Sequence, residues 1–187
     1  MQEDIATENG LQTDSYSRSF ESRISRNRRK SWVYFGNRYY NSTVMQANKY
    51  FDIKELVSSN IYKEYGDDAI KFLDPKALKA LENVREILGV SLICNNWAAG
   101  GSRNYCGYRE SGCGVGTPTG FHYKGQAFDL ISSKMTAKEM RDKLEQNQDK
   151  LIYPIRVEKW EGNKEITWLH IDISSNTHGQ KLYFFRA

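Results

Sequence analysis

The sequence predicts one α+β domain, in which a small antiparallel sheet has helices against one face and a polar site on the other. Three observations predict it: capped helices, alternating strands toward the end of the chain, and a glycine-rich loop between them. The 187 residues are 39% hydrophobic and 27% charged, which is enough apolar surface for one core. We expect a flexible arm over residues 1–45 and the folded domain over residues 46–187.

The arm is polar and locally very basic. Residues 1–31 hold too few apolar side chains to offset the entropy of ordering, which predicts flexibility. Six basic residues lie from Arg18 to Lys30, against the single acid Glu21. We favour a solubilising tail, or a segment that docks on a protein assembly, over an arm that binds nucleic acid. The aromatic stretch 32–40 predicts a strand that either joins the domain or docks on a partner.

Capping signals predict the helices. The apolar spacing of residues 51–57 begins the domain. Asp74 is a good N-cap, Pro75 suits the first helical position, and apolar residues recur every three to four positions until Gly89 ends the helix. Residues 136–139 have the spacing of a capping box and predict a second helix.

Short β-prone stretches supply the sheet. Between two of them, Gly162-Asn163 fits a two-residue type II′ hairpin, which places Glu161 opposite Lys164. The glycine-rich segment 99–120 predicts a long loop, and loops of that length are usually functional. The strands are expected at residues 90–95, 126–131, 153–160, 165–173 and 181–185.

We expect neither a membrane span nor a secretory signal. Its longest apolar runs, 151–155 and 182–185, fall far short of the roughly 20 residues that cross a bilayer. Its first thirty residues hold no apolar stretch of the length that a secretory signal requires. We therefore expect no membrane partner and a protein made in the cytoplasm, which is then released to a cell wall or associated with a virion.

Three cysteines in a chain without a signal argue against a disulfide framework. We expect Cys106 and Cys113 to form one loop disulfide or to remain free, like Cys94. A competing interpretation joins Cys106 and Cys113 to His122 as a structural zinc site. We disfavour it because the two cysteines lie further apart than the two to four residues usual in such sites.

The first informative histidine is His122. A straight strand would hold its Cα roughly 23 Å from that of Asp129, too far for a shared ligand. Gly125 permits a turn that folds His122 back beside the carboxylate. Asp129 lies among apolar residues, where an unpaired carboxylate would cost several kcal/mol, so it needs a cation.

The second informative histidine, His170, lies in an alternating strand. Trp168, His170 and Asp172 fall on one face, while apolar residues fall on the other. Two imidazoles and one carboxylate form the ligand set of a catalytic zinc, with a fourth position left for water or substrate. The third histidine, His178, lies in a polar turn and is interpreted as a loop residue.

These residues carry a resemblance to a known family. The pattern HxxGxAxD at residues 122–129, followed by WxHxD at 168–172, resembles the zinc peptidases that include D-alanyl-D-alanine carboxypeptidases and L-alanyl-D-glutamate endopeptidases, particularly the short phage forms. The resemblance covers roughly residues 49–173 and leaves out the arm. It also includes four shorter segments: residues 50–56 (YFDIKEL), Asp74-Pro75, Asn95-Asn96-Trp97 and Gly107-Tyr108-Arg109.

The resemblance implies a fold and an activity. The fold would be that of the Hedgehog and D-alanyl-D-alanine peptidase group, and the substrate would be the stem peptide of peptidoglycan. His122, Asp129 and His170 would be the Zn²⁺ ligands. Arg109 would hold a substrate carboxylate or a developing oxyanion.

Two departures from the family bear on catalysis. Gly120 replaces a common serine, and Thr167 replaces the Glu or Asp that many members place three residues before the last histidine. Hydrolysis needs a general base, and threonine cannot serve near neutral pH. Three carboxylates remain as candidates. Asp172 is either the base or the partner that orients His170, and Glu165 is a second candidate base. A regular hairpin places the third, Glu158, opposite Thr167 and away from His170 unless a bulge intervenes.

We therefore expect a zinc-dependent hydrolase of amide bonds, with Asp172 or Glu165 favoured as the base. The resemblance implies that its substrate is a peptidoglycan peptide. The alternative is a protein that keeps the peptidase scaffold without turnover and binds a virion or a cell envelope. Thr167 is the feature that favours this alternative.

Overall fold

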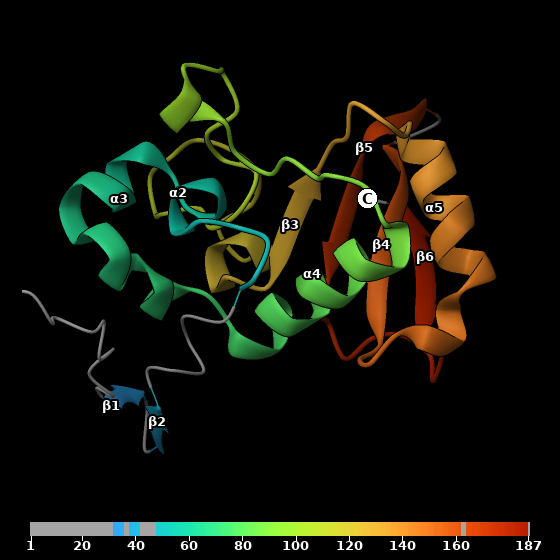
Figure 1. Ribbon diagram of the computed structural model, residues 1–187, viewed down its shortest axis with the longest axis horizontal. Helices are drawn as coiled ribbons and strands as arrows, with labels where there is room; N and C mark the ends of the chain where they lie inside the picture. Colours follow the sequence, from blue (N-terminus) through green and yellow to red (C-terminus); the bar gives the residue numbers. More distant parts are fainter. Residues whose placement is uncertain (1–31, 36–37, 42–47, 162–163, 187) are drawn as a thin grey trace, which may run out of the picture.

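The computed structural model describes residues 32–35, 38–41, 48–161 and 164–186 (Figure 1). Residues 1–31 of the predicted arm and the turn predicted at Gly162-Asn163 lie outside the described residues. The aromatic stretch expected to form a strand forms two, β1 (Trp32–Phe35) and β2 (Arg38–Asn41), which pair antiparallel.

A four-stranded sheet forms the centre of the domain. It contains β3 (Ala127–Leu130), β4 (Ile155–Glu161), β5 (Lys164–Asp172) and β6 (Leu182–Arg186), in the order β3-β5-β4-β6. Strands β3 and β4 run antiparallel to β5, and the predicted pairing of Glu161 with Lys164 is confirmed. Strand β6, however, runs parallel to β4. The sheet is therefore mixed, and the expectation of a purely antiparallel sheet is wrong.

The direction of β6 follows from the segment before it. After β5 ends at Asp172, the chain returns to the beginning of β4, where the amide of Ile155 donates to the carbonyl of Lys181 across 2.9 Å. Because β6 starts beside the first residue of β4, the two strands run in the same direction.

Both capped helices are confirmed. Helix α4 (Pro75–Leu88) begins after Asp74, whose carboxylate accepts hydrogen bonds from the first-turn amides, and ends at Gly89 in the left-handed conformation. Helix α5 (Ala137–Gln146) begins with a complete capping box between Thr136 and Glu139. The remaining helical segments are α2 (Ile53–Leu56), α3 (Ser59–Tyr65), η1 (Gly66–Phe72), η2 (Trp97–Ala99), η3 (Phe121–Lys124) and η4 (Gln148–Lys150).

The strand predicted over residues 90–95 is wrong. Only Ile93 pairs there, in an isolated bridge with Ile131. Its neighbours bond elsewhere: the carbonyl of Cys94 accepts from the Arg103 side chain, and the amide of Asn95 donates to a carbonyl in α2. The segment that follows, residues 100–120, contains no helix or strand, as its glycine content predicts.

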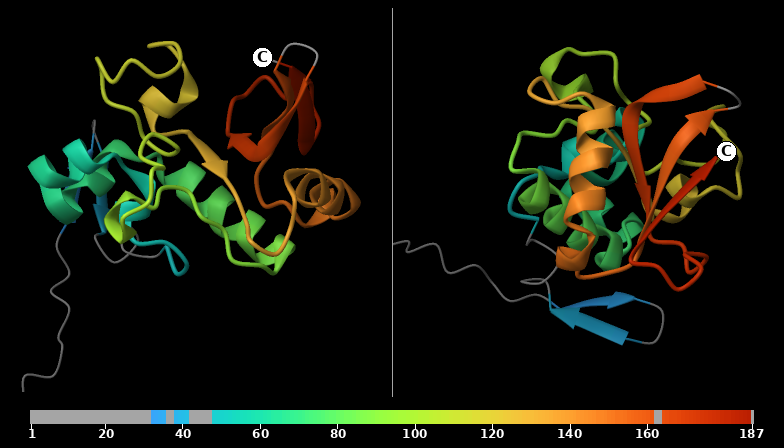
Figure 2. Two further views of the ribbon diagram at one scale, coloured as in Figure 1. Left: turned by 90° about the horizontal axis from the view of Figure 1, so that it is seen from above. Right: turned by 90° about the vertical axis from the view of Figure 1, so that its right-hand side faces the viewer.

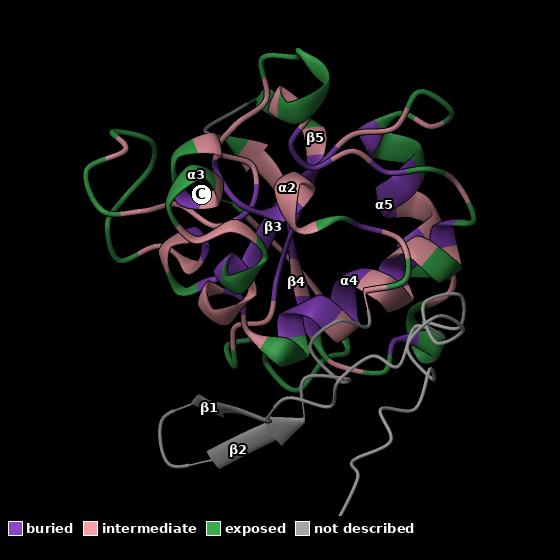
Figure 3. Cartoon of the chain, turned by 60° about the vertical axis from the view of Figure 1, so that its left-hand side comes forward, coloured by how far each residue is buried: buried purple, intermediate pink, exposed green. Residues whose placement is uncertain are grey.

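Helices α4 and α5 cover one face of the sheet, while η3 and the loop before it lie on the other (Figure 2). Apolar side chains of these two helices and of the sheet form the core, and the buried residues concentrate there (Figure 3). Arg141 of α5 is only 2% exposed and donates hydrogen bonds to the carbonyls of Ile166 and Trp168. None of the described helices is long and apolar enough to cross a membrane.

Candidate metal centre

A glycine turn places His122. Residues 121–124 form the single 3₁₀ turn η3, and Gly125 ends it with a φ of 66°, so the predicted turn between His122 and Asp129 is confirmed. The turn is tied to the start of α4, because the amide of Asp74 donates to the Gly125 carbonyl and the Gln126 side chain donates to the Asp74 carboxylate.

Replacing Gly125 by alanine is expected to lower the free energy of unfolding by more than about 3 kcal/mol. A Cβ there would overlap the carbonyl oxygen of Phe72 and lie 2.8 Å from the Cα of Leu73. Gly179 is the matched control, since its φ is also positive, at 77°, but a Cβ there meets nothing within 4 Å. Gly179→Ala should cost only about 1 to 2 kcal/mol. Equal losses in chemical denaturation would show that the close approach at Gly125 is unimportant.

The sheet brings the other polar groups together in rows. One row crosses all four strands and consists of Asp129, His170, Glu158 and Phe185. Residues paired directly across a sheet project from the same face, so these side chains share the face opposite the helices. The next row on that face consists of Ala127, Asp172, Arg156 and Tyr183.

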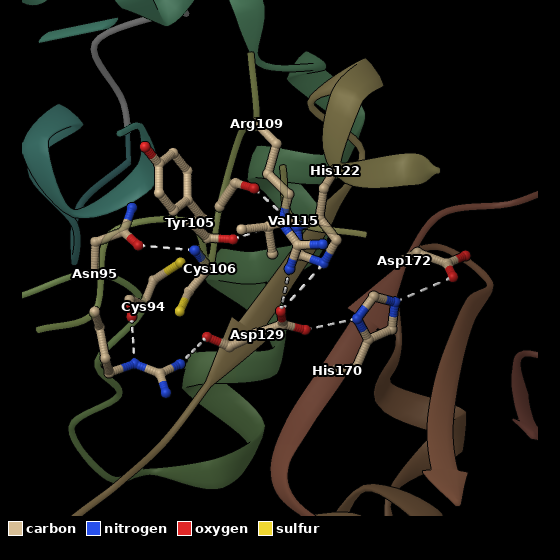
Figure 4. A network of polar contacts seen from close by, with 12 residues as sticks. Cys94, Asn95, Tyr105, Cys106, Arg109, Val115, His122, Asp129, His170 and Asp172 are labelled. Atoms are coloured by element: carbon tan, nitrogen blue, oxygen red, sulfur yellow. Dashed lines mark hydrogen bonds and ion pairs between the residues drawn. The ribbon is translucent and has the colours of Figure 1, made fainter. Parts of the chain in front are cut away.

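Three donor groups converge at the end of the first row (Figure 4). The Nδ1 atom of His170 lies 2.7 Å from Asp129 Oδ1, and the Nε2 atom of His122 lies 3.3 Å from Asp129 Oδ2. One donor atom from each residue lies within 4.8 Å of the other two. Donors around a tetrahedral zinc lie about 3.4 Å apart, so the three groups can hold a metal ion with little movement.

The contacts of each imidazole indicate which of its nitrogens faces the other donors. The Nδ1 atom of His122 lies 2.8 Å from the carbonyl oxygen of Gly107, which can only accept, so Nδ1 carries the proton and Nε2 is available to a metal. The Nε2 atom of His170 lies 3.5 Å from a carboxylate oxygen of Asp172. Both nitrogens of His170 therefore face carboxylates, and Nδ1, which lies 2.7 Å from Asp129 Oδ1, is the one directed at the other two donor groups.

The charges of the trio reinforce one another. Burial alone would raise the pKa of Asp129, but the hydrogen bonds and charges of His122 and His170 hold it far below its usual range. Burial would likewise lower the pKa of His170, whereas hydrogen bonds to Asp129 and Asp172 raise it to about 9. A metal ion at this centre therefore competes with a proton for Nδ1 of His170.

Asp172, a predicted base, is fully engaged. Its carboxylate is 1% exposed and accepts two hydrogen bonds of 2.9 Å from Arg156 and one of 2.9 Å from the amide of Ser174. Burial would raise its pKa, but the hydrogen bonds from His170, Arg156 and Ser174 lower it. This environment suits a group that orients His170 better than one that takes up a proton.

Arg109 reaches the same centre from the glycine-rich loop. Its Nη2 atom lies 2.9 Å from Asp129 Oδ2, and its Nε atom donates to the carbonyl of Tyr105 (Figure 4). The amide of Arg109 also donates to the carbonyl of His122, which ties the loop to η3. The guanidinium thus supplies positive charge beside the donor trio.

Glu165, the other predicted base, lies elsewhere. Its carboxylate binds Nη2 of Arg141 across 2.7 Å on the side of the sheet that α5 covers. Glu165 and Thr167 also line a cavity of about 580 Å³ beneath the first turn of α5, and none of the three donor residues lines it. The structure therefore keeps Glu165 apart from His170.

The sequence did not favour Glu158, which the structure places beside the trio. A regular hairpin would put Glu158 opposite Thr167. Between the pairs Trp160–Glu165 and Glu158–His170, however, β5 spans five residues while β4 spans only two. This bulge brings Glu158 opposite His170. Glu158 is buried, with 9% of its surface exposed, and no described residue hydrogen-bonds to its carboxylate. Burial raises the pKa of Glu158.

The cysteines take no part in the centre. All three are free thiols, so neither the loop disulfide nor the alternative zinc site with Cys106 and Cys113 is present in the structure. The Sγ atom of Cys113 instead lies 3.2 Å from the hydroxyl of Tyr123, and Cys94 is fully buried.

The arrangement combines a ligand trio that could hold a metal ion, a carboxylate with no partner in the described part of the chain, and a guanidinium. No family model, curated protein or solved structure matches the chain. The assignment of a function therefore depends on the chemistry of these groups and on the sequence pattern that carries them.

Proposed function

We propose that this protein is a zinc-dependent peptidase that hydrolyses amide bonds in the stem peptides of peptidoglycan. The observation that carries the proposal is the convergence of His122, Asp129 and His170, from η3, β3 and β5, with donor atoms spaced for one metal ion. Three protein ligands leave one tetrahedral position open, which is the arrangement of a catalytic zinc rather than a structural one. The resemblance of the two sequence patterns to cell-wall peptidases supports the substrate class.

Each residue around the centre has a distinct role in the proposed hydrolysis. When bound, zinc supplies Lewis acidity to the scissile carbonyl and to the attacking water. Nε2 of His122, a carboxylate oxygen of Asp129 and Nδ1 of His170 would hold it. Asp172 would hold the proton of His170 on Nε2, so that Nδ1 would be available to the metal.

Glu158 is the proton carrier of this proposal. Its carboxylate is free of hydrogen bonds among the described residues and shares a row with His170. It takes a proton from the attacking water and returns it to the leaving amine nitrogen, so the residue is regenerated after each turnover. Glu158 would thus act as the general base that Thr167 cannot be.

Arg109 supplies the positive charge that peptide hydrolysis needs. Its guanidinium lies 2.9 Å from the carboxylate of Asp129, which would be a metal ligand. From there it holds either a carboxylate of the stem peptide or the negative charge that develops on the carbonyl oxygen.

Digestion of purified peptidoglycan by the zinc-loaded full chain tests the proposal. We expect new amino groups and shortened stem peptides by mass spectrometry, and we expect both to be lost in His170→Ala. His178→Ala is the matched control and should retain activity, because His178 is exposed in the loop before β6. Zinc binding without any released product would overturn the peptidase assignment, and saturable binding to peptidoglycan in that case would point to the scaffold without turnover.

A further inference from the structure

Arg156 of β4 contacts a buried carboxylate and two aromatic rings beside the metal centre. Its side chain is 15% exposed and grips Asp172 with two parallel hydrogen bonds, from Nε to Oδ1 and from Nη2 to Oδ2, each 2.9 Å long. Such a bidentate pair fixes the carboxylate in both position and rotation. Because Asp172 Oδ2 also faces Nε2 of His170 at 3.5 Å, the grip extends to a metal ligand.

The same guanidinium also lies over two aromatic rings. Its central carbon is 5.0 Å from the ring centroid of Phe121 and 4.5 Å from that of Phe185. Phe121 immediately precedes His122 in η3, and Phe185 meets the His170 ring edge-on at 5.9 Å. Arg156 therefore touches both segments that carry the imidazoles, although the two histidines are 48 residues apart in the sequence.

We propose that Arg156 is a positioning residue that sets the orientation of the two metal-binding imidazoles. It holds His170 through Asp172 and holds His122 through the ring of Phe121. Lysine cannot replace it, because an ammonium group has neither the fork that binds a carboxylate twice nor the planar face that stacks on aromatic rings. This inference rests on the proposed metal centre, but not on the peptidase activity.

Metal binding by Arg156→Lys tests the proposal directly. We expect the affinity for Zn²⁺, measured by competition with a chromophoric chelator, to fall about 10- to 100-fold, as it does when outer partners of metal ligands are removed. We also expect the visible spectrum of the Co²⁺-loaded protein to change, because the ligand geometry changes. A purely structural role would lower the unfolding temperature of the metal-free protein but leave the spectrum and the affinity of the folded protein as in the wild type.

The control is Arg85→Lys, since Arg85 also lies over an aromatic ring, that of Tyr50, but near the end of α4 and with no carboxylate partner among the described residues. It should leave both readouts unchanged. In an Asp172→Asn background, Arg156→Lys should cause little further loss of affinity, because the coupling passes mainly through Asp172.

If Arg156→Lys does not fold, Phe121→Leu provides a second test, because it removes the ring that links Arg156 to η3. This variant should weaken Zn²⁺ binding through η3 alone. Wild-type affinity and spectrum in Arg156→Lys, or in Phe121→Leu where only that variant folds, would overturn the inference. If Arg156→Lys loses affinity for Zn²⁺ and the wild type hydrolyses no peptidoglycan, the inference is supported and only the peptidase activity is refuted. A wild type that binds no metal would refute both.

Discussion

Replacing Glu158 by glutamine should lower kcat by about 10²- to 10⁴-fold while leaving the affinity for zinc unchanged. Glutamine keeps the size of the side chain but cannot accept a proton. Glu158 lies in the row of His170, yet its carboxylate is not among the donor atoms that meet within 4.8 Å. The substitution therefore removes the base and leaves the ligand trio intact.

Glu161→Gln is the matched control on the same strand, because Glu161 is exposed and pairs with Lys164 at the far end of the hairpin. Its kcat should stay within a factor of about two of the wild-type value. If Glu158→Gln kept wild-type turnover while Asp172→Asn lost it with zinc still bound, the base would be Asp172 and the role given to Glu158 would be wrong.

Replacing Asp129 by asparagine should weaken zinc binding by more than about 100-fold, and activity should fall with it. Asp129 is the one anionic member of the trio and lies within 3.3 Å of a nitrogen of each histidine. An amide is a much poorer zinc ligand than a carboxylate. It also cannot offset the positive charge of Arg109, which lies 2.9 Å away.

Asp142→Asn provides the comparison, since Asp142 pairs with Lys138 on the exposed side of α5. Isothermal titration of both variants with Zn²⁺ should show one intact site in Asp142→Asn and none of comparable affinity in Asp129→Asn. Equal affinity in the two variants would mean that the metal binds somewhere other than the proposed trio.

Local chemistry made much of the fold predictable. The caps of α4 and α5 depend on a few neighbouring residues, so the positions of Asp74, Gly89 and Thr136 were sufficient to place both helices. The donor trio was also predictable, because a carboxylate within an apolar strand requires a cation and Gly125 permits the turn that brings His122 back.

The remaining features depend on pairing between distant segments, which local patterns do not specify. The parallel direction of β6 arises from where its connection meets Ile155, and residues 90–95 fail to form a strand because Arg103 and α2 take their backbone groups. The most important omission concerns the hairpin, where a bulge in β5 moves Glu158 beside His170 and away from Thr167. A hairpin turn fixes the register only next to itself.

X-ray absorption at the zinc edge of the metal-loaded protein tests the central claim most directly. We expect one zinc per chain, with nitrogen and oxygen neighbours at about 2.0 to 2.2 Å that include two imidazoles. A sulfur neighbour at about 2.3 Å, or a chain that takes up no zinc, would contradict a centre built from His122, Asp129 and His170.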